Sequence, residues 1–154
     1  MPFLVDGNNL LGLRPEVLAQ DPGVRGRLVT RLAAFARSKR TTVVVVFDGE
    51  PGEGELRADM ALGGVRVIFS GTKSDADGRI LRFLDEVKDP AGYTVVTSDR
   101  ALGDRARHRR ASVVNSLKFR RTLEAVEPAG AGEEAPLTPD QIADWESWFQ
   151  NRDS

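Results

Sequence analysis

The sequence contains no cysteine and only one histidine, His108, among its 154 residues. The lack of cysteine excludes disulfides and thiolate metal sites, and a single histidine excludes a zinc site built on several imidazoles. The first apolar run is too short for a signal peptide, and no later run is long enough to span a bilayer. We therefore expect a soluble, cytoplasmic protein with no membrane partner.

The sequence also lacks an excess of charge of either sign, because its formal net charge is only −1 at pH 7. A nucleic-acid partner therefore has to be held by a local basic patch and not by overall charge. Hydrophobic residues make up 40% of the chain, which is enough for one domain with a buried core.

Three apolar segments rich in β-branched residues each end on an aspartate, at residues 3–6, 43–48 and 93–99. Continuous runs of this kind indicate strands buried on both faces, as in a parallel sheet covered by helices. Ligands of such sheets bind beyond the carboxyl ends of the strands, where Asp6, Asp48 and Asp99 are expected. A turn or a helix cap explains any one of these aspartates, but the recurrence favours a functional site.

The remaining pattern predicts a doubly wound α/β fold with a mainly parallel central sheet flanked by helices. A Gly/Asn turn is expected at residues 7–9, a loop or short helix at 14–21, and a charged segment at 100–110. The other expected elements are strands at residues 65–69 and 112–114, longer helices at 24–36, 80–87 and 117–126, and a short helix at 55–62.

Residues 127–136 contain no large apolar side chain, which predicts a flexible linker. The linker would join an α/β domain over residues 1–126 to an amphipathic helix over residues 137–154. Residues 138–141 have the capping pattern of a helix start. The apolar stripe that includes Trp145 favours docking on the same chain, and binding to a partner is the alternative.

A second group of acids lies at Asp75 and Asp77, at the start of the helix that follows strand 65–69. The helix dipole favours acids there by at most about 1 kcal/mol, yet Asp77 is also expected to point into the crevice of the strand-end aspartates. Two carboxylates about 4 Å apart repel by roughly 4 kcal/mol at an effective dielectric near 20. Protons or cations must offset this repulsion. An oxygen-only ligand set suits Mg²⁺ or Mn²⁺, which promote phosphodiester hydrolysis in many nucleases.

Five motifs occur in order and together resemble the YacP-like NYN domain of the PIN-like nuclease superfamily. They are Leu4-Val5-Asp6-Gly7-Asn8-Asn9, Val46-Phe47-Asp48-Gly49, Ser74-Asp75-Ala76-Asp77, Thr97-Ser98-Asp99 and Val113-Val114-Asn115-Ser116-Leu117-Lys118-Phe119. The resemblance covers about residues 2–126. It implies a PIN-like fold and a metal-dependent endoribonuclease that cleaves single-stranded RNA, with some relatives acting on messenger RNA at the ribosome.

The same resemblance implies roles for single residues. Asp6, Asp77 and Asp99 become catalytic acids, and Asn9 becomes a polar partner near Asp6. Gly78 and Ala101 stand where many relatives have further acids. Asp75 and Asp104 are the candidates to replace those acids. The full set of expected metal ligands is Asp6, Asp48, Asp75, Asp77, Asp99 and Asp104.

Eight basic residues and only one acid, Asp104, lie between Arg100 and Arg121. Because this interval follows Asp99 directly, we expect it to flank the crevice and hold RNA phosphates. The alternative is that these residues only form a solvated face. Phe119 is the nearby aromatic residue that is a candidate for base stacking. The candidate RNA-binding residues are Arg105, Arg107, Arg109, Arg110, Lys118, Arg120 and Arg121.

Two functional alternatives stay open at this point. A non-catalytic RNA-binding or adaptor protein would retain the fold after losing acids, as Gly78 and Ala101 suggest. A metal-dependent phosphatase with Asp6 as nucleophile would normally have an acid where Asn8 stands. A P-loop is disfavoured because Thr72 replaces the glycine required before the lysine and the upstream glycine is missing, and the arginines around His108 disfavour a serine-nucleophile triad.

Overall fold

A computed structural model describes residues 2–12, 23–50 and 61–126 of the chain. Six strands form one sheet in the order β3-β4-β2-β1-β5-β6. All neighbouring strands pair in parallel except β3, which is antiparallel to β4. The strands are β1 Phe3–Asp6, β2 Val43–Phe47, β3 Ala61–Leu62, β4 Val65–Phe69, β5 Thr94–Val96 and β6 Ser112–Val114. The predicted mainly parallel α/β architecture is confirmed.

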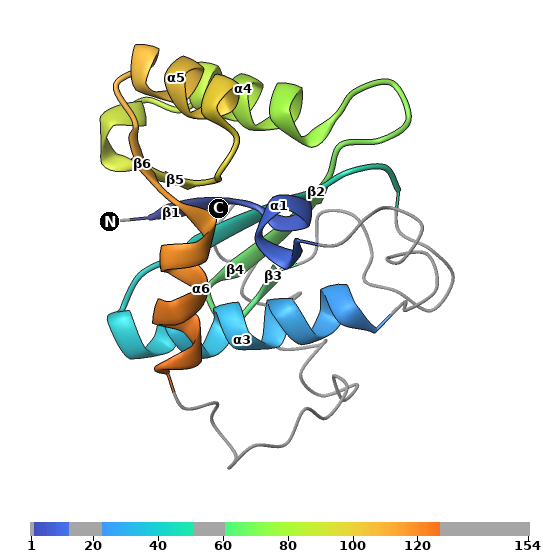
Figure 1. Ribbon diagram of the computed structural model, residues 1–154, viewed down its shortest axis with the longest axis vertical. Coiled ribbons are helices and arrows are strands. Elements are labelled where there is room, and N and C mark those ends of the chain that lie inside the picture. The colour runs from blue at the N-terminus through green and yellow to red at the C-terminus, as the bar shows by residue number, and fades with distance from the viewer. Residues whose placement is uncertain (1, 13–22, 51–60, 127–154) are drawn as a thin grey trace.

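Helices cover both faces of the sheet (Figure 1). The helices α4 and α5 lie on one face, α3 and α6 lie on the other, and the short α1 follows β1 directly. The helices are α1 Gly7–Leu11, α3 Val24–Lys39, α4 Ala76–Glu86, α5 Arg100–His108 and α6 Ser116–Glu124, with a 3₁₀ turn η1 at Pro90–Gly92. No helix among these residues is long and apolar enough to cross a membrane.

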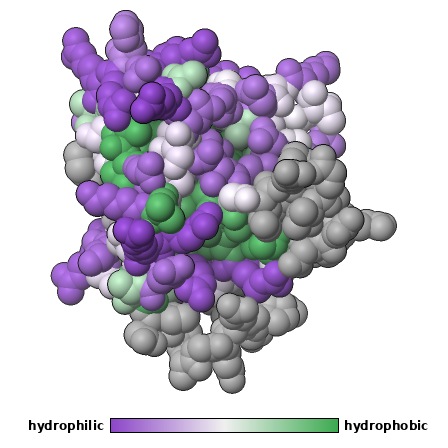
Figure 2. All heavy atoms as spheres, viewed as in Figure 1, coloured by the Kyte–Doolittle hydropathy of each residue, from purple (hydrophilic) through white to green (hydrophobic). Residues whose placement is uncertain are grey.

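The valine-rich strands supply two separate cores, one on each face of the sheet. Leu4 packs with the α4 and α5 side chains, whereas its neighbour Val5 packs with α3 and α6. This division follows from the alternation of side chains along a strand. Hydrophobic side chains are visible mainly in the band between the two helical layers, and the outer helical surfaces are largely hydrophilic (Figure 2). Burial of both faces explains why β2, in the interior of the sheet, is apolar at every position.

The strand order has its switch point at β1. This strand pairs with β2 on one side and β5 on the other. The chain first extends the sheet through β2 and β4, and then crosses over to β5 and β6. In doubly wound sheets, the carboxyl ends of the strands at such a switch point are the usual place of ligand binding.

Three local predictions differ from the structure. Residues 7–9 begin the helix α1 and do not form an isolated turn, and the charged segment after Asp99 folds into α5. The predicted short helix at 55–62 is wrong at its end, because Ala61–Leu62 is the strand β3, joined to β4 by two glycines with positive φ. The rest of that prediction lies outside the described residues. So do the predictions for 14–21, for the linker 127–136 and for the helix 137–154.

Candidate active site

Asp6 is the last residue of β1 and is buried, with only 4% of its surface exposed. Thr97 directly follows β5, and its hydroxyl donates a hydrogen bond of 3.2 Å to Asp6 Oδ2. Burial raises the pKa of Asp6 to about 7, and the negative charge of Asp77 adds to this increase. The hydrogen bonds from Thr97 and from the Asn9 backbone act in the opposite direction but are outweighed. A central, desolvated carboxylate therefore lies at the carboxyl end of the middle strand.

Asp77 lies in the first turn of α4 and is half-buried. Its pKa is raised to about 6, first by burial and then by the negative charge of Asp99. Asp75, a hydrogen bond with Asp99, and Asp48 contribute further increases. The carboxylates of β1, of the start of α4 and of the start of α5 are thus close enough to repel each other, as the sequence predicts for a shared crevice.

The other three acids are fixed by backbone amides. Asp48 Oδ1 accepts from the Ala76 amide at 2.6 Å, and Asp75 Oδ1 accepts from the Gly78 amide at 2.7 Å. Asp99 Oδ1 accepts from the Leu102 amide at 3.2 Å. Helix capping therefore does account for part of the role of these acids. Each cap engages Oδ1 and holds the carboxylate at the edge of the crevice.

Asn9 joins three segments that are far apart in the sequence. Its Oδ1 accepts from the Ser98 amide at 2.8 Å and from the Ser116 hydroxyl at 2.6 Å. Ser98 Oγ in turn accepts from the Ser116 amide at 3.1 Å. This network ties the start of α6 to α1 and to the loop after β5. Asn9 therefore positions the elements around the acids.

The neighbouring Asn8 differs in one respect. Its side-chain oxygen is buried and has no hydrogen-bond partner among the described residues. A buried amide oxygen without a partner costs free energy, so such an atom next to Asp6 is consistent with a site that receives a ligand or water.

The two departures from the family pattern have different structural outcomes. A side chain at Gly78 would place its Cβ 3.1 Å from Asp75 Oδ1, so the Asp75 carboxylate already fills that space. Asp104, three residues after Ala101, has 78% of its side chain exposed and pairs with Arg107 at 3.3 Å. It also does not contribute to the raised pKa of Asp6 or Asp77. The structure brings Asp75 to the acidic cluster and leaves Asp104 on the surface of α5.

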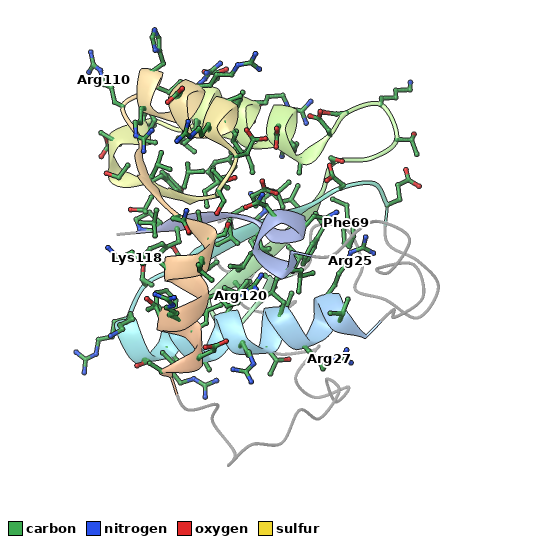
Figure 3. The ribbon with its side chains drawn as sticks, in the orientation of Figure 1. Arg25, Arg27, Phe69, Arg110, Lys118 and Arg120 are labelled. Carbon is green, nitrogen blue, oxygen red and sulfur yellow. The ribbon has the colours of Figure 1, made fainter. Side chains whose placement is uncertain are left out.

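The predicted RNA-binding residues fall into two separate groups. Figure 3 shows Arg110 beyond the far end of α5 and Lys118 on α6, on the other side of the sheet. Because α5 begins directly after Asp99 and runs for nine residues, its C-terminal end lies roughly 13 Å along the helix axis from Asp99. In the α6 group, the Arg120 side chain donates to the Leu10 carbonyl.

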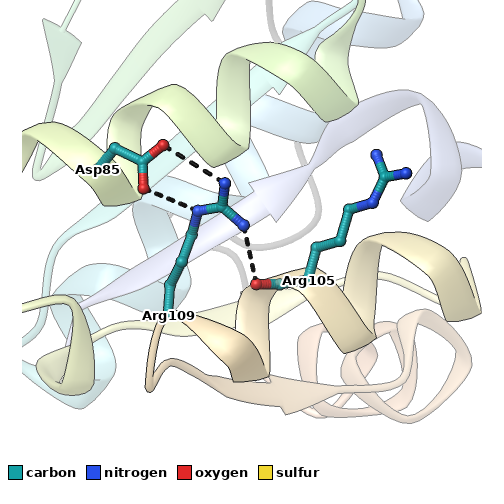
Figure 4. Close-up of polar contacts among 3 residues, drawn as sticks. All are labelled: Asp85, Arg105 and Arg109. Atoms are coloured by element: carbon teal, nitrogen blue, oxygen red, sulfur yellow. Dashed lines mark hydrogen bonds and ion pairs between the residues drawn. The ribbon is translucent and has the colours of Figure 1, made fainter.

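The arginines of α5 are partly engaged within the protein. Arg109 Nε donates to Asp85 Oδ1 at 2.8 Å, and its guanidinium also donates to the Arg105 carbonyl (Figure 4). Arg107 pairs with Asp104. Phe119, expected as a stacking aromatic, is buried against Phe3 and Phe35, so that expectation is wrong.

The sequence interpretation assigned no role to the hydroxyls of Thr97, Ser98 and Ser116. All three are parts of motifs at the ends of β5 and β6, and polar residues directly after apolar strands were the available signal. The Thr97 and Ser116 hydroxyls bond to Asp6 and Asn9, which lie 91 and 107 residues away, and the Ser98 hydroxyl accepts from the Ser116 amide, 18 residues away, so only the tertiary structure identifies these contacts.

The donor chemistry of the cluster fits a hard divalent cation. Among the described residues, no three Asp, Glu, His or Cys side chains are already arranged as a metal cage. All candidate ligands are carboxylate oxygens, however, and the pKa values of Asp6 and Asp77 are raised, first by burial and then by neighbouring carboxylates, so negative charge on these two groups is poorly stabilised. A cation such as Mg²⁺ or Mn²⁺ offsets this kind of charge excess and accepts oxygen ligands.

Comparison with known proteins gave a family and two solved structures. The YacP-like NYN domain model matches residues 3–146, a range that continues past the described domain into the predicted linker and last helix. Two crystal structures of Rae1 (YacP) from Bacillus subtilis are similar to this structure, each at 25% sequence identity and covering 82% of this chain. The W164L mutant has a TM-score of 0.62 and 76% of its chain is covered; the other structure has 0.66 and 75%. No curated protein matched the chain.

Proposed function

This chain belongs to the YacP-like NYN domain family, and we propose that it is a metal-dependent endoribonuclease that hydrolyses phosphodiester bonds in single-stranded RNA. Membership of the family indicates an RNA-related function of the nuclease type. The observation that carries the more specific proposal is the cluster of five aspartates at the switch point of the sheet, in which the pKa of Asp6 is raised to about 7 and that of Asp77 to about 6.

In this proposal, Asp6, Asp77 and Asp99 are the ligands of Mg²⁺ or Mn²⁺, and Asp48 and Asp75 adjoin them. When bound, the cation supplies the positive charge that activates water and stabilises the leaving oxygen of the phosphodiester. Asp104 is left out of the ligand set because its side chain is exposed and paired with an arginine on its own helix.

In this proposal, the side chains of the protein orient the site and hold or release the proton of Asp6. Thr97 holds the Asp6 carboxylate, and Asn9 holds the start of α6 against the loop that carries Asp99. Without a cation, the Asp6 carboxyl is protonated in about half of the molecules at neutral pH, because its pKa is about 7 and ionisation would place charge in a desolvated, crowded cluster. Binding of a divalent cation is expected to release that proton.

We further propose that the substrate is bound mainly through its phosphates, with little reading of the bases. Basic residues adjoin the site, whereas the one aromatic side chain expected to stack on bases, Phe119, is buried. The family resemblance implies messenger RNA at the ribosome for some relatives. We extend that proposal to this chain, which would place its activity in the cytoplasm.

One alternative is supported by a specific observation. Ala101 stands where many relatives have an acid, and the nearest acid on α5 is turned away to Arg107. A protein that binds RNA through this fold without cleaving it is therefore the second candidate.

The test is cleavage of labelled single-stranded RNA by the purified full-length chain in Mn²⁺ and in EDTA, with a nucleoside monophosphate as a parallel substrate. We expect RNA cleavage in Mn²⁺ alone and no release of phosphate from the monophosphate. Asp77→Asn should abolish cleavage because it removes a ligand from the cluster.

Glu86→Gln is the matched control, since it removes one charge at the opposite end of the same helix, from an exposed ion pair with Arg82. It should cleave RNA at the wild-type rate. RNA binding without cleavage by the wild-type chain in Mn²⁺ would support the adaptor alternative, and phosphate release from the monophosphate would support a phosphatase.

A further inference from the structure

A basic groove lies between the C-terminal end of α3 and the exposed side of α6. It has a volume of about 610 Å³ and is lined by Ser38 and Lys39 from α3, by Lys118, Arg121 and Thr122 from α6, and by Ala125 and Val126 just after α6. Three cations and no carboxylate line it, although the whole chain has a net charge of −1. Within the described part of the chain, none of these three cations has an acid within ion-pair distance.

Local helix stability explains only two of the three cations. Lys39 and Arg121 lie in the last turns of their helices, where a positive charge is favourable by about 0.3–1 kcal/mol. Lys118 lies in the first turn of α6, where the helix dipole disfavours a positive charge. Its position therefore opposes the stability of its own helix.

The exposure of the Leu117 side chain, next to Lys118, is also unfavourable for the isolated protein. It is 54% exposed and is the one large hydrophobic residue that is exposed among those described. Exposed single apolar residues are common, but this one shares the first turn of α6 with the unfavourable lysine. An apolar and a cationic side chain presented together match the two parts of a nucleotide, the base and the phosphate.

The helix α6, which forms one wall of the groove, begins beside the candidate site. Ser116, the first residue of α6, contacts Asn9 and the loop that carries Asp99. From there α6 runs back along the sheet toward the C-terminal end of α3, which leads into the amino end of β2. Lys118 is therefore the groove residue of α6 nearest the candidate site, Leu117 directly precedes it in the same turn, and Lys39 lies on the other wall.

The cations of α5 differ from those of the groove. Arg109 and Arg107 form ion pairs with Asp85 and Asp104 and lie at the end of α5 remote from the acids. Lys118 and Arg121 are exposed and lie on the helix that is hydrogen-bonded to the site. The phosphates of an RNA strand that extends from the acidic cluster along α6 would therefore lie near cations that have no acid within ion-pair distance among the described residues.

From these observations we infer that the groove between α3 and α6 carries the RNA strand that flanks the scissile bond. Lys118, Arg121 and Lys39 contact successive backbone phosphates, and Leu117 contacts the base nearest the acids. This inference rests on the proposed nuclease function for its substrate. It adds Lys39 and Leu117, which the sequence patterns did not identify, to the RNA-binding surface.

The test measures binding of a fluorescein-labelled single-stranded oligouridylate to the full-length chain in EDTA, over a range of salt concentrations. Lys39→Ala/Lys118→Ala removes one cation from each wall of the groove. Both residues are exposed and alanine favours helices, so the variant should fold. Loss of two phosphate contacts should reduce the slope of log affinity against log salt by about 1.4.

The matched control is Arg82→Ala/Lys88→Ala, which removes the same charge from exposed positions at and beyond the end of α4. It should bind with nearly the wild-type salt slope. Leu117→Ala should weaken binding several-fold at an unchanged slope, because it removes an apolar contact and no charge. Leu117→Met, which keeps the apolar volume, should restore most of the affinity.

The inference is overturned if the groove variant keeps the wild-type slope, or if the control loses as much slope as the groove variant. A wild-type chain that does not bind the oligouridylate also overturns it. Binding in EDTA does not depend on cleavage. Groove-dependent binding by a chain that fails to cleave in Mn²⁺ would therefore support this inference while refuting the nuclease proposal.

Discussion

Replacing Asp6 with asparagine should make the protein more stable at neutral pH when no divalent cation is present. In the unfolded chain this carboxyl has a pKa near 3.8, whereas in the fold its pKa is raised to about 7. Between these values the native state binds more protons than the unfolded state, so the stability contributed by Asp6 falls as the pH rises and levels off above about pH 7. The rise of about three pKa units corresponds to a loss of at most about 4 kcal/mol in the free energy of unfolding.

The assay is urea unfolding of the wild type and Asp6→Asn in EDTA at about pH 5 and about pH 8. Because groups remote from the cluster titrate alike in both proteins, the difference between their free energies of unfolding reports the Asp6 carboxyl together with its coupling to Asp77. The variant should gain about 3 kcal/mol relative to the wild type between the two pH values, since about two of the three units lie in that interval. Its side-chain oxygen can still accept the hydrogen bond from Thr97.

Adding Mn²⁺ provides the control within the same experiment. A cation that binds the folded cluster stabilises the wild type by mass action, and it should stabilise the variant less because one ligand is missing. A difference between the two proteins that stays constant from pH 5 to pH 8 in EDTA would refute the argument that Asp6 is a desolvated acid in a crowded cluster.

Three further predictions concern packing, the polar network and the tail. Gly7→Ala should destabilise the protein by roughly 1–3 kcal/mol in urea unfolding, because its Cβ would lie 2.5 Å from a ring carbon of the last residue of β2; Gly26→Ala, where nothing lies within 4 Å, should be neutral or stabilising by up to about 1 kcal/mol. Ser116→Ala should lower the rate of RNA cleavage while calorimetry shows Mn²⁺ affinity unchanged, because it frees α6 without touching an acid; equal losses of both would contradict this. The only tryptophans, Trp145 and Trp148, lie in the predicted last helix, so their emission should shift to longer wavelength on unfolding if that helix docks on its own domain, and constant emission would argue against docking.

The sheet was predictable because its strands are buried on both faces. Runs such as residues 43–47 are apolar at every position, which few structures other than a covered parallel strand require. The helix α1 was not predictable from its residues, because Gly7, Asn8 and Asn9 favour a turn. The helix is possible because Gly7 lacks a side chain and lets the backbone approach Phe47, a contact that joins two distant segments.

The acids of the candidate site were predictable for the same reason, since an aspartate after a buried parallel strand can only lie at one edge of the sheet. What the sequence lacked was the direction of side chains on helices. Asp104 and Phe119 are each close to the motifs, yet one faces solvent and the other the core. That distinction depends on how α5 and α6 pack, and both are nine-residue helices with only three buried residues each.

The contact between Asn9 and Ser116 also has a consequence for the order of events during synthesis. The two residues are 107 positions apart, and closing a loop of that length costs about 4 kcal/mol of chain entropy beyond a constant. Asp6 and Asn9 leave the ribosome early, whereas α6 follows only after β6 has been made. A nascent chain that ends before residue 116 therefore carries all five clustered aspartates without the hydrogen bonds that hold α6 and the Asp99 loop together. The crevice is completed last, so the growing polypeptide acquires its acids long before it acquires a finished site.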